Sequence, residues 1–204
     1  MEHTCNQITI RGNLLELPRF SHENHGRRFY RFTVEVPRLS ENVDLLPVVA
    51  EERVLCDMDL SSGDMLTVTG QIRSHNTREN GIRRLLIFIF ASKITAECGE
   101  AINSVILEGP LCREPVFRRT PMGREICDVM LAVPRSAYKR ADYLPCILWG
   151  RTAKEISHCH TRDRIRLEGR LQSRIYTKLT DNGPIERTAY EISALTAEIL
   201  DDSI

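Results

Sequence analysis

The sequence lacks several features that would assign it to a special class of protein. Its 204 residues carry 28 Lys and Arg against 28 Asp and Glu, so net charge gives no case for a nucleic-acid or membrane partner, although a neutral total can conceal a local patch. No apolar run approaches the roughly 18 residues of a membrane helix, and no charged-then-apolar leader begins the chain. We therefore expect a cytoplasmic protein with no membrane partner.

Catalytic motifs are also missing. The chain contains no GxSxG, no HExxH and no glycine-rich phosphate loop. Asp142 and Asp163 fall in a strand-entry loop and a turn, and both recur in the first half as Asp44 and Asp64, which favours structural roles. We expect no enzyme activity and no cofactor.

Paired cysteines are absent, although single cysteines are not. The seven are odd in number and scattered, with no CxxC pair, which favours free thiols in a reducing compartment. The run His158-Cys159-His160 could suggest a metal, but adjacent ligands on a helix point in different directions and no second cluster completes a tetrahedral set. We expect no metal site.

The feature that organises the chain is an internal repeat. Asn6, Gly12, Pro18, Phe20 and the run Val36-Pro37-Arg38 recur 97 positions later, as Asn103, Gly109, Pro115, Phe117 and Val133-Pro134-Arg135. The offset grows in small steps, through Asp44 and Asp142, Ser74 and Ser173, and the Asn80-Gly81 and Asn182-Gly183 turns, to Ala91 and Ala194. Loop insertions would produce such steps. We predict two copies of one domain, residues 1–98 and 99–204.

Periodicity within each copy is that of strands. Alternating or β-branched runs at 7–12, 29–36, 65–72 and 84–90 return at 104–109, 164–171 and 189–195, several with a glycine of the kind that marks a bulge or barrel corner. One helix interrupts each set, near 51–60 and 152–160. Five strands with a helix between the third and fourth predict an all-β chain of two tandem OB-folds, which are small Greek-key barrels. We expect Phe20 and Phe117 to belong to the shared core.

The second copy resembles the bacterial single-stranded-DNA-binding proteins along nearly its whole length. The resemblance rests on the order and spacing of NSVILEGPL at 103–111, PVFRRTPMG at 115–123, ILWGRTA at 147–153 and LEGRLQSRIY at 167–176. It implies cytoplasmic binding of single strands in replication, recombination or repair, contacts with proteins of those processes, and four OB-folds in one assembly. The family commonly ends in a long linker with an acidic tip, whereas this chain ends at residues 201–204, soon after its last expected strand.

A binding site follows from the resemblance and from the residue types. Proteins that hold single strands of any sequence use aromatic faces for base stacking and cations along the backbone. Residues 99–180 carry 15 Lys and Arg against 9 Asp and Glu, a local excess of six. By the resemblance, stacking aromatics fall at Tyr143, Trp149 and Tyr176, with Tyr138 in a nearby loop. The expected phosphate contacts are Arg118, Arg135, Lys139, Arg151, Arg170 and Arg174.

The first copy lacks these aromatics. The repeat replaces Tyr143, Trp149 and Tyr176 by Leu45, Glu51 and Thr77, and only cations such as Arg38 and Arg53 remain as accessory contacts. We expect the second copy to carry most of the affinity, and two chains to form a homodimer with four barrels. The alternative is a primosome-like or regulatory OB-fold protein that acts mainly through protein contacts or on RNA. A structural assembly protein that has lost binding is a second alternative, which the retained aromatics disfavour.

Overall fold

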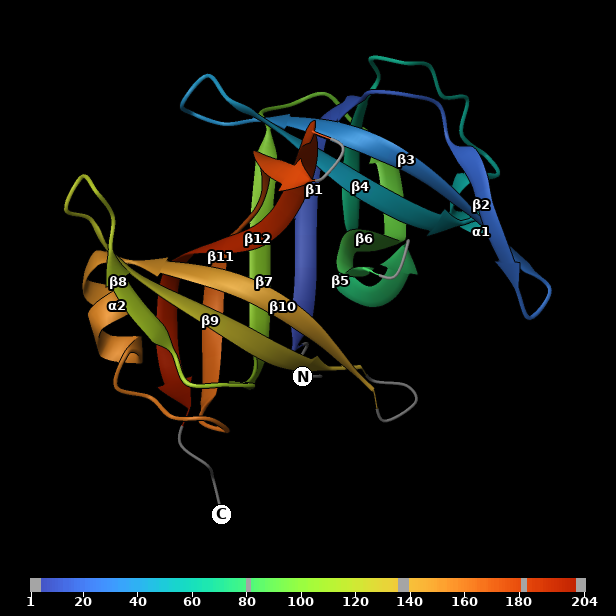
Figure 1. Cartoon of the computed structure of the whole chain (residues 1–204). Helices are drawn as coiled ribbons and strands as arrows, with labels where there is room; N and C mark the ends of the chain where they lie inside the picture. The colour runs from blue at the N-terminus through green and yellow to red at the C-terminus, as the bar shows by residue number, and fades with distance from the viewer. Residues whose placement is uncertain (1–4, 80–81, 136–139, 181–182, 201–204) are drawn as a thin grey trace.

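The computed structural model describes residues 5–79, 82–135, 140–180 and 183–200. Within these residues strands dominate, and each half contains six strands and one short helix (Figure 1). The first half consists of β1 (Asn6–Leu14), β2 (Arg19–Asn24), β3 (Arg27–Pro37), β4 (Val43–Glu51), α1 (Glu52–Leu55), β5 (Met65–Glu79) and β6 (Ile82–Ala96). The second half consists of β7 (Ile102–Pro110), β8 (Val116–Arg119), β9 (Glu125–Pro134), β10 (Ala141–Trp149), α2 (Gly150–Ile156), β11 (Arg164–Thr180) and β12 (Gly183–Leu200).

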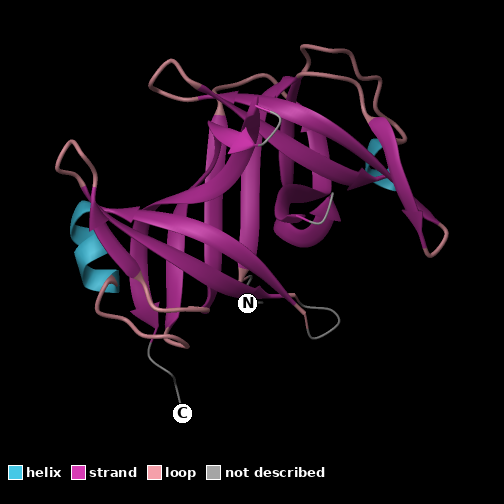
Figure 2. Ribbon diagram, in the orientation of Figure 1, coloured by secondary structure: helices cyan, strands magenta, loops and turns pink. Residues whose placement is uncertain are grey.

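Five strands of each half form a small barrel. In the first half the order is β3-β4-β6-β5-β1, and pairing between β1 and β3 closes the ring; the second half repeats the order as β9-β10-β12-β11-β7, with a bridge between Leu111 and Leu131. The helix lies between the third and fourth barrel strands, and the two helices sit at opposite ends of the molecule (Figure 2). The expected all-β class with two OB-folds is confirmed. The expected Asn80-Gly81 turn and Asn182 lie outside the described residues.

The short strands β2 and β8 add a sixth strand to each half and form the two edges of the sheet. Every residue of both strands is exposed. The expectation that Phe20 and Phe117 belong to the core is therefore wrong, because each lies on an edge strand that extends beyond the barrel, with 51% and 40% of its surface exposed. Phe20 instead packs edge-on against Tyr30, with ring centroids 6.0 Å apart.

Alternation along the strands separates the core from the outer face. In β10, Leu144, Cys146 and Leu148 are buried, while Tyr143 and Trp149 are exposed. Period-two alternation of this kind leaves one face of a strand for packing and the other for binding.

A bulge in β12, opposite Glu168 and Gly169 of β11, bends the sheet around the barrel. The register between β11 and β12 shifts at Glu168 and Gly169, and the same shift occurs between Thr69 and Gly70 in the first half. A Cβ atom at Gly169 would lie 2.4 Å from the carbonyl oxygen of Ser193, which no side chain tolerates. Glycine is thus required where the strands approach closely.

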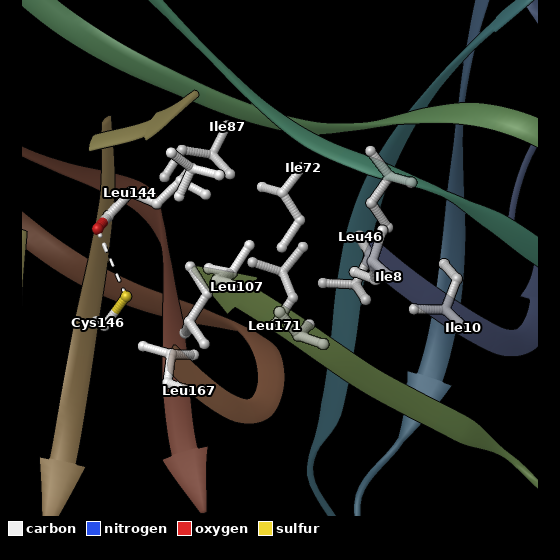
Figure 3. Close-up of a cluster of buried hydrophobic side chains, with 14 of the residues drawn as sticks. Ile8, Ile10, Leu46, Ile72, Ile87, Leu107, Leu144, Cys146, Leu167 and Leu171 are labelled. Atoms are coloured by element: carbon white, nitrogen blue, oxygen red, sulfur yellow. Dashed lines mark hydrogen bonds between the residues drawn. The ribbon is translucent and has the colours of Figure 1, made fainter. Parts of the chain in front are cut away.

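The two barrels share one sheet and one hydrophobic core. Strand β1 pairs antiparallel with β7 from Asn6 opposite Leu107 to Arg11 opposite Ile102, so that all twelve strands form a continuous sheet. Buried side chains of both halves form a single cluster, in which Ile8 and Ile72 lie beside Leu107 and Leu171 (Figure 3). The two copies therefore pack as one unit.

Candidate nucleic-acid interface

Strand β10 carries two of the expected stacking residues on its outer side. Tyr143 is 46% exposed and Trp149 is 40% exposed, and both project from the same face of the strand. They are six positions apart along the strand, which corresponds to about 20 Å at ~3.3 Å per residue. We call the outer surface of β9, β10, β12 and β11 that carries Tyr143, Trp149 and Tyr176 the aromatic face.

Local geometry explains why the only tryptophan ends this strand. Gly150 follows with a φ of 55°, a left-handed conformation that favours glycine, and turns the chain from β10 into α2. The indole is left at the end of the strand, where its Nε1 donates a hydrogen bond to Ser193 Oγ on the parallel strand β12, at 3.1 Å. This bond orients the ring while 40% of its surface stays open.

Tyr176 lies on β11, beside a cation of the same strand. The guanidinium carbon of Arg174 lies 5.9 Å from the ring centroid of Tyr176, within the range of a cation–π contact. Arg174 also has Glu191 at 3.9 Å. The ring is 38% exposed, so a base could stack on it while the arginine contacts the adjoining phosphate.

Most of the expected cations have an acidic partner. Arg118 donates two hydrogen bonds to Asp128, and this interaction raises the pKa of the guanidinium, while Arg151 donates to Glu155 at 2.7 Å. Both pairs are largely exposed, and exposed ion pairs contribute little, so a phosphate could replace either carboxylate. Arg170 forms no ion pair with any of the described residues. Tyr138 and Lys139 lie outside the described residues.

Arg135 is held at the junction between the copies. Its Nε and Nη2 donate to the carboxylate of Asp142, at 2.9 and 2.6 Å, and Nη2 also donates to the carbonyl oxygen of Ser74, at 3.0 Å. The fully buried Asp142 accepts a further bond from the backbone N–H of Ser74, at 2.6 Å, and one from Arg73. These contacts occupy the donors with which Arg135 was expected to bind phosphate.

Arg38 makes the reciprocal contact from the first copy. It donates to Asp44 and, at 2.7 Å, to the carbonyl oxygen of Ser173, whose N–H donates to Asp44 at 2.7 Å. We call these two arrangements, Arg38 and Asp44 on Ser173 and Arg135 and Asp142 on Ser74, the reciprocal clamps. Each fixes a β-strand of one copy against a long strand of the other. Asp44 and Asp142 thus have structural roles, as the repeat indicated.

The first copy presents a different surface at the equivalent positions. Leu45 and Thr77 take the places of Tyr143 and Tyr176, and Glu51 stands where Trp149 stands in the second copy. Glu51 forms ion pairs with Arg53, at 3.0 Å, and with Arg27, at 3.7 Å. Arg53 is 75% exposed, so it could still meet a phosphate.

Two groups of possible nucleic-acid-binding residues were not predicted from the sequence. On the hairpin of β2 and β3, the Arg28 guanidinium lies 5.4 Å from the Phe20 ring and 5.7 Å from the Tyr30 ring, and the phenol of Tyr30 donates to Glu52. The second group is the pair Arg84 and Arg187, which line one groove between the copies. Their positions differ by 103, the offset of the repeat at Ala91 and Ala194, so the repeat itself contained the signal.

No helix among the described residues is long and apolar enough to cross a membrane. Those residues also contain no group of three or more His, Cys, Asp or Glu that could hold a metal ion.

Comparison with sequence families gives a match in the second copy. Residues 102–200 match the model of the single-strand binding protein family. The chain is 36% identical over 80 residues to single-stranded DNA-binding protein B of Bacillus subtilis, a stretch that is 36% of this chain and 71% of that protein. It is 33% identical over 81 residues, 37% of this chain, to protein A of the same organism, of which it spans about half, 47%.

Comparison with solved structures extends the likeness to both copies. The single-stranded DNA binding protein of Thermus aquaticus superposes with a TM-score of 0.79, covering 98% of this chain and 94% of that chain, at 22% identity. A variant of that protein, which carries an internal deletion and one point substitution, gives the same TM-score of 0.79 and is covered over 96% of its chain. At this identity the likeness concerns the fold alone, and it supports two OB-folds in one chain.

Proposed function

We propose that this chain, which belongs to the single-strand binding protein family, binds single-stranded DNA without sequence preference on the aromatic face of its second copy. Bases would stack on Tyr143, Trp149 and Tyr176, and exposed arginines would contact the phosphates between them. Stacking accepts every base, since every base has a π-face. Catalysis has no part in the proposal.

One observation carries the proposal: three exposed aromatic rings occur on strands β10 and β11 of the second barrel, and none of the three has an aromatic equivalent at the repeat positions of the first barrel. A core role would bury them, yet each keeps more than a third of its surface open. Arg174 contacts the ring of Tyr176, and two further expected arginines, Arg118 and Arg170, come from β8 and β11, on either side of β10 in the sheet. The arrangement is that of a stacking platform with flanking cations.

A division of labour between the copies is part of the proposal. The unit 99–204 would supply most of the affinity, and the unit 1–98 would act as a scaffold with accessory contacts. Arg53 is available for such a contact, whereas Arg38 is held in a reciprocal clamp, with only 23% of its side chain exposed. Because the copies share a core, this division is best tested by substitutions in the full chain.

The proposal is tested by titrating the full chain with oligo-dT. Binding is measured from the fluorescence of Trp149, which is the only tryptophan in the sequence. Tyr143→Ala combined with Trp149→Ala should cost about 2–6 kcal/mol if each ring stacks one base; here binding is followed by anisotropy of labelled DNA. Leu17→Ala is the control, since it truncates an exposed apolar side chain between β1 and β2 of the first copy, away from the aromatic face. Affinity that survives the double substitution would refute the proposal.

The salt dependence of binding and a comparison of oligo-dT with oligo-U distinguish single-stranded DNA binding from the alternative functions. The logarithm of the affinity for oligo-dT should fall with the logarithm of salt concentration, by about 0.7 per phosphate neutralised. Tighter binding of oligo-U than of oligo-dT would favour an RNA-directed protein. No change of Trp149 emission and no gel shift with either would favour a protein that acts through protein contacts.

The biological setting that we propose is the cytoplasm, with roles in replication, recombination or repair. We further propose a homodimer, because two chains would bring four barrels together and two-fold symmetry is the commonest arrangement of oligomers. Light scattering should then give twice the chain mass of 23.4 kDa at tens of micromolar. A monomer mass under those conditions would exclude the dimer.

A further inference from the structure

A groove separates the β5–β6 hairpin of the first copy from the β11–β12 hairpin of the second. It has a volume of about 530 Å³, inside the range of roughly 300–1,000 Å³ that is usual for small-molecule sites. One wall belongs to β6 and the other to β10, β11 and β12. Its lining residues are Arg84, Leu85, Leu86 and Ile87 on the first wall, and Pro145, Tyr176, Arg187, Thr188, Ala189 and Tyr190 on the second.

The groove has a cation on each wall. Arg84 and Arg187 occupy equivalent positions of the repeat, and both face the same space from opposite hairpins. The Nε of Arg187 is buried and has no hydrogen-bond partner among the described residues. A buried donor without a partner is costly, and an anionic oxygen in the groove could satisfy it.

An aromatic ring completes the lining. Tyr176 is the cross-strand partner of Arg187 in the β11–β12 ladder, so ring and guanidinium are neighbours. Leu85 and Leu86 are exposed apolar side chains on the facing strand, and they could cover the second side of a stacked base. Burial raises the pKa of Tyr190, which keeps this phenol neutral and compatible with a nearby phosphate.

The groove is continuous with the aromatic face. Pro145, which lines it, lies on the outer side of β10 between Tyr143 and Trp149. Single-stranded DNA that stacks on Tyr143 and Trp149 can therefore continue into the groove. The opposite wall of the groove belongs to the first copy.

From these contacts we infer that the groove binds one nucleotide of the single strand, with the base against Tyr176 and the phosphate between Arg84 and Arg187, and that it passes the strand from the second copy to the first. This inference rests on the proposed function, because it extends the same binding path. It assigns the first copy a direct contact with DNA through β6, at a position that lacks an aromatic ring of its own.

The experiment measures binding of the full chain to oligo-dT of about 30 nucleotides, within the length that two OB-folds can cover, at several salt concentrations. Arg84→Ala and Arg187→Ala should each lower the salt slope, and the two together should lower it by about 0.7, which corresponds to roughly fivefold weaker binding at 0.1 M salt. Arg113→Ala is the matched control, since it removes an exposed cation from the loop after β7, outside the groove, and it should leave the slope unchanged.

The outcomes separate the inference from the proposed function. If the unaltered chain binds oligo-dT and both arginine variants keep its slope, the groove is not part of the path and only the inference fails. If the unaltered chain does not bind oligo-dT, the proposed function fails and the inference with it. Thermal unfolding of each variant identifies a folding defect; should Arg187→Ala show one, Arg84→Ala alone decides.

Discussion

The reciprocal clamps predict that the buried carboxylate of Asp142 contributes more to the free energy of unfolding than that of Asp44, its counterpart in the repeat. Asp142 is fully buried and accepts hydrogen bonds from the Ser74 N–H, from Arg135 and from Arg73. Asp142→Asn keeps the shape but removes the charge, and it turns one acceptor into an NH₂ group that faces donors. Breaking a buried ion pair in this way costs about 3–5 kcal/mol. Because Arg135 and Arg73 retain 27% and 17% exposure, water compensates in part, and we expect about 3 kcal/mol.

Asp44 is the internal comparison. It pairs with a single arginine, Arg38, because the repeat places Gln172 where Arg73 stands in the other clamp. Asp44→Asn therefore leaves one guanidinium without its partner instead of two. A hydrogen bond to a charged group is worth about 1.5–3 kcal/mol, and because one arginine loses its partner instead of two, Asp44→Asn should cost less than Asp142→Asn, about 2 kcal/mol.

Urea unfolding, followed by Trp149 fluorescence and by circular dichroism, measures both losses. Asp128→Asn is the control, because its pair with Arg118 is exposed and should contribute less than about 1 kcal/mol. A loss below about 1 kcal/mol for Asp142→Asn, or a larger loss for Asp44→Asn, would refute the reasoning.

Three further predictions follow from single sites. Burial raises the pKa of the Cys127 thiol to about 11, so iodoacetamide at about pH 8 should leave it unmodified in the native protein and alkylate it in urea, as read by mass spectrometry. The N–H of Thr161 lowers the pKa of Glu114, so the stabilisation by this carboxylate is present above its unfolded value of about 4.3 and is lost as pH falls through the lowered folded value. The difference in Tm between the wild type and Glu114→Gln should be full at about pH 6 and shrink steadily as the pH falls below about 4.3. Gly169→Ala should cost about 3 kcal/mol in urea unfolding, the upper part of the range for overpacking, because its Cβ would meet a backbone oxygen; an unchanged midpoint would show that the strands can separate there.

The barrel could be predicted from the sequence because its evidence is local. Alternation in 29–36, the glycines at 70 and 169 and the repeat itself each report on one strand or one bend. The ends of the long strands could not be predicted in the same way. Strands β5 and β11 extend to Glu79 and Thr180, well past the expected 72 and 171, and form hairpin arms in which 75–78 and 174–177 no longer alternate between core and water.

In the candidate site, too, features set by local sequence could be predicted and features set by distant contacts could not. Exposed aromatic residues at Tyr143 and Trp149 could be expected from position in a strand, because the outer side of a barrel strand is set by period two. The environment of an arginine depends on distant partners instead. Arg38 and Arg135 recur together with Asp44, Asp142 and the two serines, yet nothing in one copy alone shows that each arginine contacts a serine of the other.

The shared sheet changes how this protein can evolve. In an assembly of identical single-barrel chains, every substitution appears in all barrels at once, so a residue that benefits one surface must be tolerated on each. Here β1 pairs with β7 inside one chain, and a mutation alters one barrel only. The junction must keep two matched clamps, whereas the outer surfaces are free to differ, as Trp149 and Glu51 do. Covalent duplication thus allows one barrel to specialise without loss of the two-barrel geometry.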